Sequence, residues 1–168
     1  MRAPILLLAA LLALVLWLSA CGDDEDDAPD SGGDELTAEE FAAEADALCV
    51  SFDKENPLPP EPENAKEAAE ASELEADLRV ELMDQITAIG APEELQADLD
   101  TYSEQSQAIV DAVEEQAAAA EARDADAYQS GYADVDLLLN ERLETAEALG
   151  FESCGQNSPA TVSGAEAP

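Results

Sequence analysis

The sequence predicts an all-α protein, an up-down four-helix bundle that follows an apolar leader and an acidic tether. Alanine supplies much of the 46% hydrophobic content and only 4% of the residues are aromatic, a mixture that favours helices over strands. Apolar residues recur every three or four positions in four stretches, and no strong alternating strand pattern is present. Each stretch carries one apolar stripe, and short connections favour burying such stripes between antiparallel neighbours.

The first element is an apolar leader. Residues 5–18 form a nearly unbroken apolar run after Arg2, and Ser19 and Ala20 follow it. This order of charged, apolar and small residues is typical of a secretory signal peptide, which we assign to residues 1–20. A membrane-spanning anchor is the alternative, although a span needs about 20 apolar residues.

A cysteine ends the leader. The stretch Leu18-Ser19-Ala20-Cys21 resembles the lipobox of bacterial lipoprotein precursors. The resemblance implies a diacylglyceryl group on Cys21, cleavage before it, and a new amine open to acylation, for example by palmitate. Several acyl chains anchor a protein stably, so the expected location is the outer, extracytoplasmic face of the cell membrane. By known sorting rules, Gly22 argues against inner-membrane retention if the host has an outer membrane. A secreted protein with an incidental cysteine is the alternative.

Residues 21–36 form the expected linker, which contains eight carboxylates between Gly22 and Glu35. This composition buries little apolar area and repels itself, so we expect an extended, disordered tether. Calcium capture by the run is an alternative, although flexible carboxylates without turn glycines bind calcium weakly and unselectively.

The bundle itself is expected over residues 37–154. Thr37 and Glu40 form a capping box at the start of the first helix, and Leu36 can pack on Phe41. The helix is expected to stop at Asn56 and the prolines that follow. We interpret the proline-rich residues 57–62 as a stiff connector, with a polyproline ligand as the alternative. The apolar face of this helix comprises Phe41, Ala45, Leu48 and Phe52.

Three longer helices complete the expected bundle. The second runs over about 64–89 and stops at Gly90. The third ends near 121–123, where Asp124 or Asp126 caps the fourth, and Gly150 supplies a left-handed cap after which Phe151 folds back. The expected stripes are Ala71, Leu74, Leu78, Leu82, Ile86 and Ile89; Leu95, Leu99, Tyr102, Ser106, Ile109, Val113 and Ala120; and Tyr128, Gly131 or Tyr132, Val135, Leu139, Leu143, Ala146 and Leu149. The tail over 155–168 is expected to be disordered.

Two further cysteines remain once Cys21 is modified. An even pair in an exported protein predicts a disulfide between Cys49 and Cys154. Closing a loop of ~100 residues stabilises a fold by about 4–5 kcal/mol in the chain-entropy treatment, an upper figure. Two thiols without histidine do not make a zinc site, and no CxxC motif supports a redox role.

Three short motifs resemble a family. "ADALC" (45–49), "APEELQADLDTY" (91–102) and "LGFESCG" (149–155) resemble small acidic actinobacterial secreted lipoproteins with one early and one late cysteine around a helical domain. The match covers about residues 41–155. The family has no established activity, so the resemblance implies only a fold and a location. Arg123-Asp124 departs from the Gly-Asp expected at that turn.

Charge and composition exclude several functions. With 41 acids, 6 bases and a net charge of −35, the chain repels nucleic-acid phosphates. It has no histidine, the commonest general base and metal ligand. The EF-hand-like pattern that starts at Asp126 fails, because Tyr128 and Leu137 occupy ligand positions. Glu75 and Arg79 form one of the few favourable pairs one helical turn apart.

We therefore expect a monomeric, non-enzymatic lipoprotein without cofactor, metal site or nucleic-acid partner. It is anchored to the membrane through lipid on Cys21, and its bundle serves as a binding or scaffold module for an unknown envelope protein or small ligand. An extracytoplasmic divalent-cation-binding protein that uses its acidic surface is the alternative.

Overall fold

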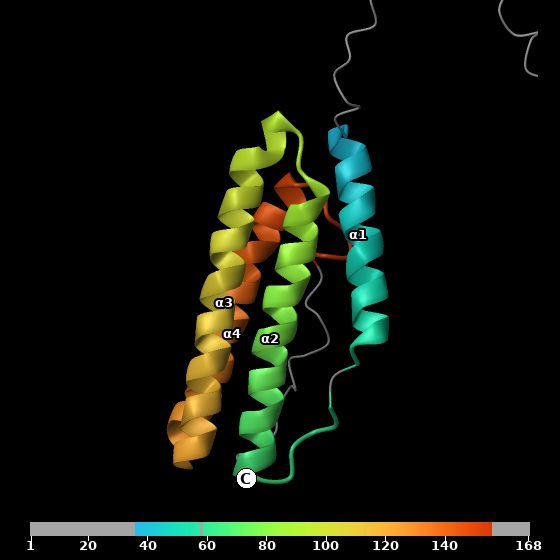
Figure 1. Cartoon of the computed structure of the whole chain (residues 1–168). Coiled ribbons are helices and arrows are strands. Elements are labelled where there is room, and N and C mark those ends of the chain that lie inside the picture. Colours follow the sequence, from blue (N-terminus) through green and yellow to red (C-terminus); the bar gives the residue numbers. More distant parts are fainter. Residues whose placement is uncertain (1–35, 58, 156–168) are drawn as a thin grey trace, which may run out of the picture. The chain divides into compact units, whose positions relative to one another are not determined.

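The structure is a computed structural model that describes residues 36–57 and 59–155. The predicted signal peptide, Cys21, almost all of the acidic linker and the tail beyond Gly155 lie outside these residues. In the described part the chain forms a four-helix bundle without β-strands, as predicted (Figure 1). Its helices are α1 (Ala38–Glu55), α2 (Ala65–Ile89), α3 (Gln96–Ala122) and α4 (Ala125–Ala148), with a short 3-10 helix, η1 (Glu93–Leu95), before α3. Helices that follow one another in the sequence run antiparallel.

The start of α1 confirms the predicted capping box. The Thr37 hydroxyl accepts a hydrogen bond from the Glu40 amide at 3.3 Å, and the Glu40 carboxylate accepts one from the Thr37 amide at 2.9 Å. The Thr37 amide thereby lowers the pKa of Glu40. Leu36 packs against the core cluster that contains Phe41, and the Asn56 amide donates to the carbonyl of Phe52 where the helix ends.

The buried face of α1 differs by one position from the prediction. Phe41, Ala45 and Phe52 are buried as expected, but Cys49 is buried in place of Leu48, which is only half-buried. The cysteine lies deeper because it bonds to the segment that follows α4.

The predicted face of α2 is partly confirmed. Ile86 is buried as expected, whereas Leu74 is 42% exposed and is wrong. Ala71, Leu78, Leu82 and Ile89 are half-buried, and Leu82 and Ile89 pack against the core cluster. The other fully buried residues of this helix are Ala68, Ala69, Ser72 and Ala76, which are small and allow α2 to approach its neighbours closely.

The α3 stripe is confirmed, except that Leu95 lies in η1 and is half-buried. On α4, Tyr128, Val135, Leu139, Ala146 and Leu149 are buried, whereas Leu143 is half-buried. Of the two predicted caps, Asp124 is the one used, because its carboxylate accepts from the amide of Ala127 at 3.1 Å.

Gly150 ends the bundle in the predicted left-handed conformation, with φ of 77°. The amide of Phe151 then donates to the carbonyl of Ala146 at 2.9 Å, and the amide of Gly150 donates to that of Glu147 at 3.1 Å. This pair of bonds is a Schellman motif. It turns the chain back so that Phe151 is buried against Phe41 and Tyr102.

Candidate functional site

Two links hold α1 to the segment that follows α4. Cys49 and Cys154 form the predicted disulfide, with their Cα atoms 5.4 Å apart. One turn earlier, the carboxylate of Asp46 accepts hydrogen bonds from three successive backbone amides at 2.7–2.8 Å. These amides belong to Glu152, Ser153 and Cys154. A single side chain therefore satisfies the backbone of this segment and ties it to α1.

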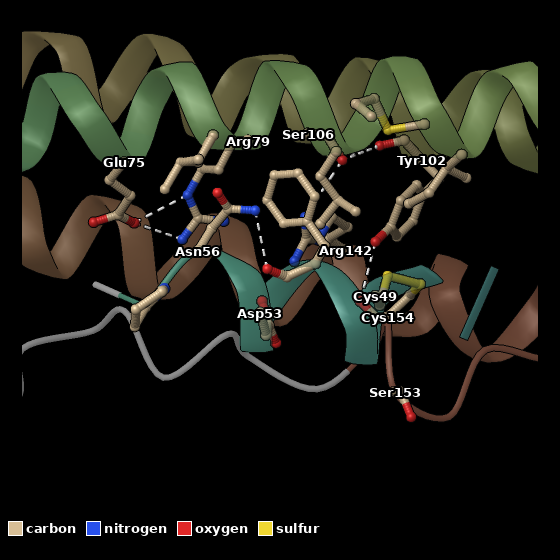
Figure 2. Close-up of a pocket in the computed structure, with 16 residues that line it drawn as sticks. Cys49, Asp53, Asn56, Glu75, Arg79, Tyr102, Ser106, Arg142, Ser153 and Cys154 are labelled. Carbon is tan, nitrogen blue, oxygen red and sulfur yellow. Dashed lines mark hydrogen bonds and ion pairs between the residues drawn. A yellow bond between two sulfur atoms is a disulfide. The ribbon is translucent and has the colours of Figure 1, made fainter. Parts of the chain in front are cut away.

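Beside this linkage lies a cavity of about 290 Å³ (Figure 2). All four helices contribute to its lining, and it reaches the disulfide at one end. Its volume lies near the lower end of the range for pockets that hold drug-sized ligands, about 300–1,000 Å³. It also exceeds an engineered apolar cavity of about 150 Å³ that accommodates benzene. The space is large enough for a small organic molecule.

One part of the lining is apolar. Leu78, Leu82, Met83 and Ile86 come from α2, and Phe52 comes from α1. These are the α2 leucines that the expected core stripe contained. Leu78 and Leu82 are only half-buried, because one side of each borders the cavity, and Leu82 also packs against the core cluster that contains Ile86.

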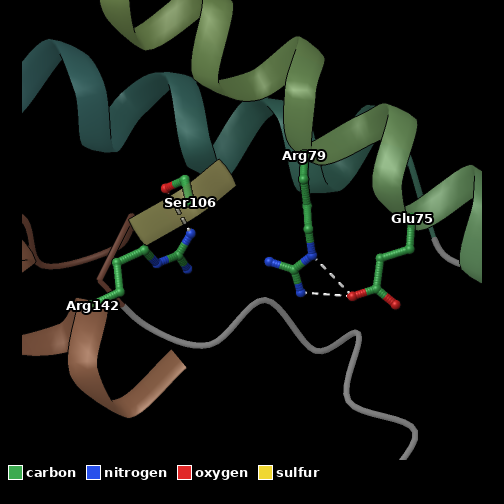
Figure 3. A network of polar contacts seen from close by, with 4 residues as sticks. All are labelled: Glu75, Arg79, Ser106 and Arg142. Atoms are coloured by element: carbon green, nitrogen blue, oxygen red, sulfur yellow. Dashed lines mark hydrogen bonds and ion pairs between the residues drawn. The ribbon is translucent and has the colours of Figure 1, made fainter. Parts of the chain in front are cut away.

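The lining also contains an ion pair on α2. The Arg79 guanidinium donates to one carboxylate oxygen of Glu75 from Nε at 3.0 Å and from Nη2 at 2.6 Å (Figure 3). Their side chains are only 11% and 17% exposed. The pair confirms the interaction predicted from the sequence spacing, and it lies far less exposed than an ordinary surface salt bridge.

Arg142, on α4, is the second arginine in the lining. Its guanidinium lies 5.1 Å from the centroid of the Tyr102 ring and donates a long hydrogen bond of 3.4 Å to the hydroxyl of Ser106. Burial lowers the pKa of Arg142, partly offset by Tyr102, and the nearby charge of Arg79 lowers it further. Among the described residues, no carboxylate lies within ion-pair distance of this guanidinium.

Hydrogen bonds fix the surroundings of Arg142. The Ser106 hydroxyl donates to the carbonyl of Tyr102 at 2.7 Å, and the Tyr102 hydroxyl donates to the carbonyl of Cys154 at 3.0 Å. Burial raises the pKa of Tyr102. The aromatic ring and the hydroxyl that contact the guanidinium are therefore held in place by α3 and by the disulfide segment.

The structure brings some of the predicted site residues together and does not reach others. Cys49 and Cys154 are joined and line the cavity, whereas Cys21 lies outside the described residues. Sequence reasoning identified Arg79 only as the partner of Glu75 and not as a site residue, and it missed Arg142. The sequence held a signal for both arginines. Arg79 lies three positions before Leu82 and Arg142 three positions after Leu139, so each lies next to an expected apolar face. Such positions are notable because the whole chain has only six basic residues.

Two features are absent from the described residues. No helix there is long and apolar enough to cross a membrane. Within the same part of the chain, no three or more histidine, cysteine, aspartate or glutamate side chains are grouped as metal ligands would be.

Comparison of the chain with protein-family models, with curated proteins and with solved structures finds no match in any of the three.

Proposed function

We propose that the protein is a non-enzymatic lipoprotein of the extracytoplasmic membrane face, whose helical bundle binds a small ligand in the cavity beside α1. The lipid anchor is supported by the apolar leader followed by Leu18-Ser19-Ala20-Cys21. The binding role is supported by the cavity, and this is the observation that carries the proposal.

The cavity of about 290 Å³ is open on one side and borders all four helices. Because side chains in proteins pack closely wherever they can, an unfilled concavity of this size beside a small bundle calls for an explanation. Ligand sites, in contrast, are concave, mostly apolar and supplied with a few fixed polar groups. The leucine-rich wall together with Arg79, Arg142 and Ser106 has this composition.

Titration of octanamide into the full-length protein, followed by amide NMR, tests the binding role. This short amphiphile is neutral, so its binding reports on the cavity and not on charge. We expect saturable shifts at amides that line the cavity, such as those of Phe52 and Leu82. Leu82→Trp fills the space and is expected to abolish them.

The matched control is Leu137→Trp, because Leu137 is 60% exposed and does not line the cavity. It should bind octanamide as the unaltered protein does. Non-saturable shifts, or equal binding by both tryptophan variants, would contradict a ligand site in the cavity.

The anchor is tested separately by the intact mass of the protein from cell membranes. We expect loss of residues 1–20 and a lipid adduct on Cys21, with partition into the detergent phase. An uncut chain, or a mature chain without adduct, would contradict the lipoprotein assignment and leave the binding proposal standing.

A further inference from the structure

The charges that line the cavity are informative about its ligand. Two of the six basic residues of the chain, Arg79 and Arg142, lie here although the protein carries a net charge of −35. Acidic side chains are so abundant that a carboxylate partner for each arginine would be easy to place. Glu75 pairs with Arg79, and Arg142 has no such partner among the described residues.

An arginine in this position is costly to the folded protein. Arg142 is half-buried, and partial removal of a guanidinium from water without a charged partner disfavours the folded state, whereas an apolar side chain of similar volume is often neutral or stabilising there. The aromatic contact with Tyr102 offsets part of this cost. The arrangement is understandable if the missing partner is a negative charge carried by the ligand.

The geometry leaves Arg142 able to bind such a charge. A guanidinium has five N–H donors in a planar fork that matches a carboxylate, and the described residues occupy one of them, at 3.4 Å. Figure 3 shows the guanidinium groups of Arg79 and Arg142 pointing toward one another from α2 and α4. A carboxylate beside Arg142 would thus also lie near the Arg79–Glu75 pair.

The neighbouring side chains favour a single negative charge. Glu75 neutralises Arg79, and Asp53 adds a further carboxylate to the lining from α1. A dianionic head group would meet repulsion from both acids, whereas a monoanion needs only Arg142. Beyond the arginines, the leucine, methionine and isoleucine side chains of α2 offer an apolar surface for a tail.

We propose that the cavity binds a small amphiphile with one carboxylate, whose head group pairs with Arg142 and whose apolar tail lies along Leu78, Leu82 and Ile86. This inference rests on the proposed binding function and assigns the chemical class of its ligand.

Competition between two isosteric probes tests the assignment in the full-length protein. Octanoate and octanamide have the same tail and head groups of similar size, and only octanoate is charged. We expect octanoate to bind at least tenfold more tightly than octanamide. In Arg142→Met this preference should disappear while octanamide still binds.

Arg123→Met is the matched control, because it removes the same charge from an exposed position and should leave the preference intact. A purely structural role for Arg142 predicts a different result, since Arg142→Met would then lower the denaturant midpoint of the ligand-free protein. We expect the midpoint to stay the same or rise.

The outcomes separate this inference from the function on which it rests. Equal binding of octanoate and octanamide, or tighter binding of octyl phosphate than of octanoate, would overturn the carboxylate assignment alone. Absence of saturable binding by either probe would overturn the binding function and this inference together.

Discussion

Along α3, close apolar packing holds the bundle together, whereas α1, which also buries Phe41 and Ala45 in a core cluster, lies beside a cavity and is attached in addition through a disulfide and a carboxylate. At one end of α2, α3 and α4, the core consists of Ala68, Ala69, Ala120 and Tyr128. The helices approach so closely nearby that a Cβ on Gly131 would lie 2.9 Å from the Cγ of Gln116. Leu78 and Leu82, in contrast, are half-buried and border the cavity.

The difference shows how a small bundle can keep an open site. Filling the space beside α1 with side chains would stabilise the fold and remove the cavity. Instead the Cys49–Cys154 bond restricts the unfolded chain across 105 residues, and Asp46 holds three backbone amides. The disulfide and these hydrogen bonds thus stabilise the attachment of α1, where the cavity leaves fewer packing contacts between side chains.

The largest expected effect comes from removing the disulfide. The double variant Cys49→Ala/Cys154→Ala should lose about 2–5 kcal/mol of unfolding free energy, since a long loop is no longer closed in the unfolded state. Amide hydrogen exchange should accelerate in α1 well before it does in α3. Urea unfolding measures the free energy, and exchange mass spectrometry measures the exchange rates. Exchange that accelerates equally in all helices would contradict a special dependence of α1 on the disulfide.

Asp46→Asn should have the next largest effect. The amide side chain has one acceptor oxygen and no charge, so charge-assisted bonds to the three backbone amides are lost or weakened, at a cost of about 2 kcal/mol. The control is Asp77→Asn, which removes the same charge between Glu73 and Glu81 on the exposed face of α2. It should leave the urea midpoint unchanged or raise it slightly.

Arg123→Gly is expected to stabilise the fold by about 1 kcal/mol, through the turn between α3 and α4. Arg123 has φ of 58°, a left-handed conformation that glycine adopts without the steric cost paid by other residues. Arg123→Ala keeps this cost and removes the same charge, so it should not reproduce the gain. If alanine and glycine raise the thermal midpoint equally, charge and not backbone conformation is the cause.

Alkaline titration is expected to give the smallest effect. Burial raises the pKa of Tyr102, beside the disulfide, and that of Tyr132, which is also hydrogen-bonded to Tyr128. A raised pKa in the folded state contributes stability that is complete below about pH 10 and is lost as the pH rises further. Tyrosinate absorbance in single Tyr→Phe variants resolves the two groups.

The same titration also tests whether the disulfide supports Tyr102 more than it supports Tyr132. Without the disulfide, the pKa of Tyr102 should fall toward its ordinary value, because the segment that carries its Cys154 partner is released. Tyr132 lies in the closely packed part and should keep its raised pKa. A parallel fall at both tyrosines would mean that the disulfide supports the whole bundle evenly.

The sequence predicted the number of helices, their caps and the disulfide, because capping residues, glycine stops and cysteine count act locally or by simple pairing. It succeeded only in part for α2, where Ile86 is buried as expected but Leu74 is exposed and Ala68, Ala69 and Ala76 are buried. An apolar pattern favours leucine over alanine, whereas close helix packing favours the smaller residue. The cavity could not be predicted for the same reason. Arg142 lies next to the apolar face of α4 in the sequence pattern. That its side chain borders a cavity depends on how the helices pack, which the pattern does not contain.

If the cavity beside α1 is a ligand site in which Arg142 binds the head group, a bound ligand must lie there. A crystal structure of the protein with 8-bromooctanoate locates it, because anomalous scattering marks the bromine at the end of the tail. We expect bromine between Leu78 and Ile86, with the carboxylate on the Arg142 guanidinium. Bromine bound only on the outer surface, with the cavity empty, would contradict it.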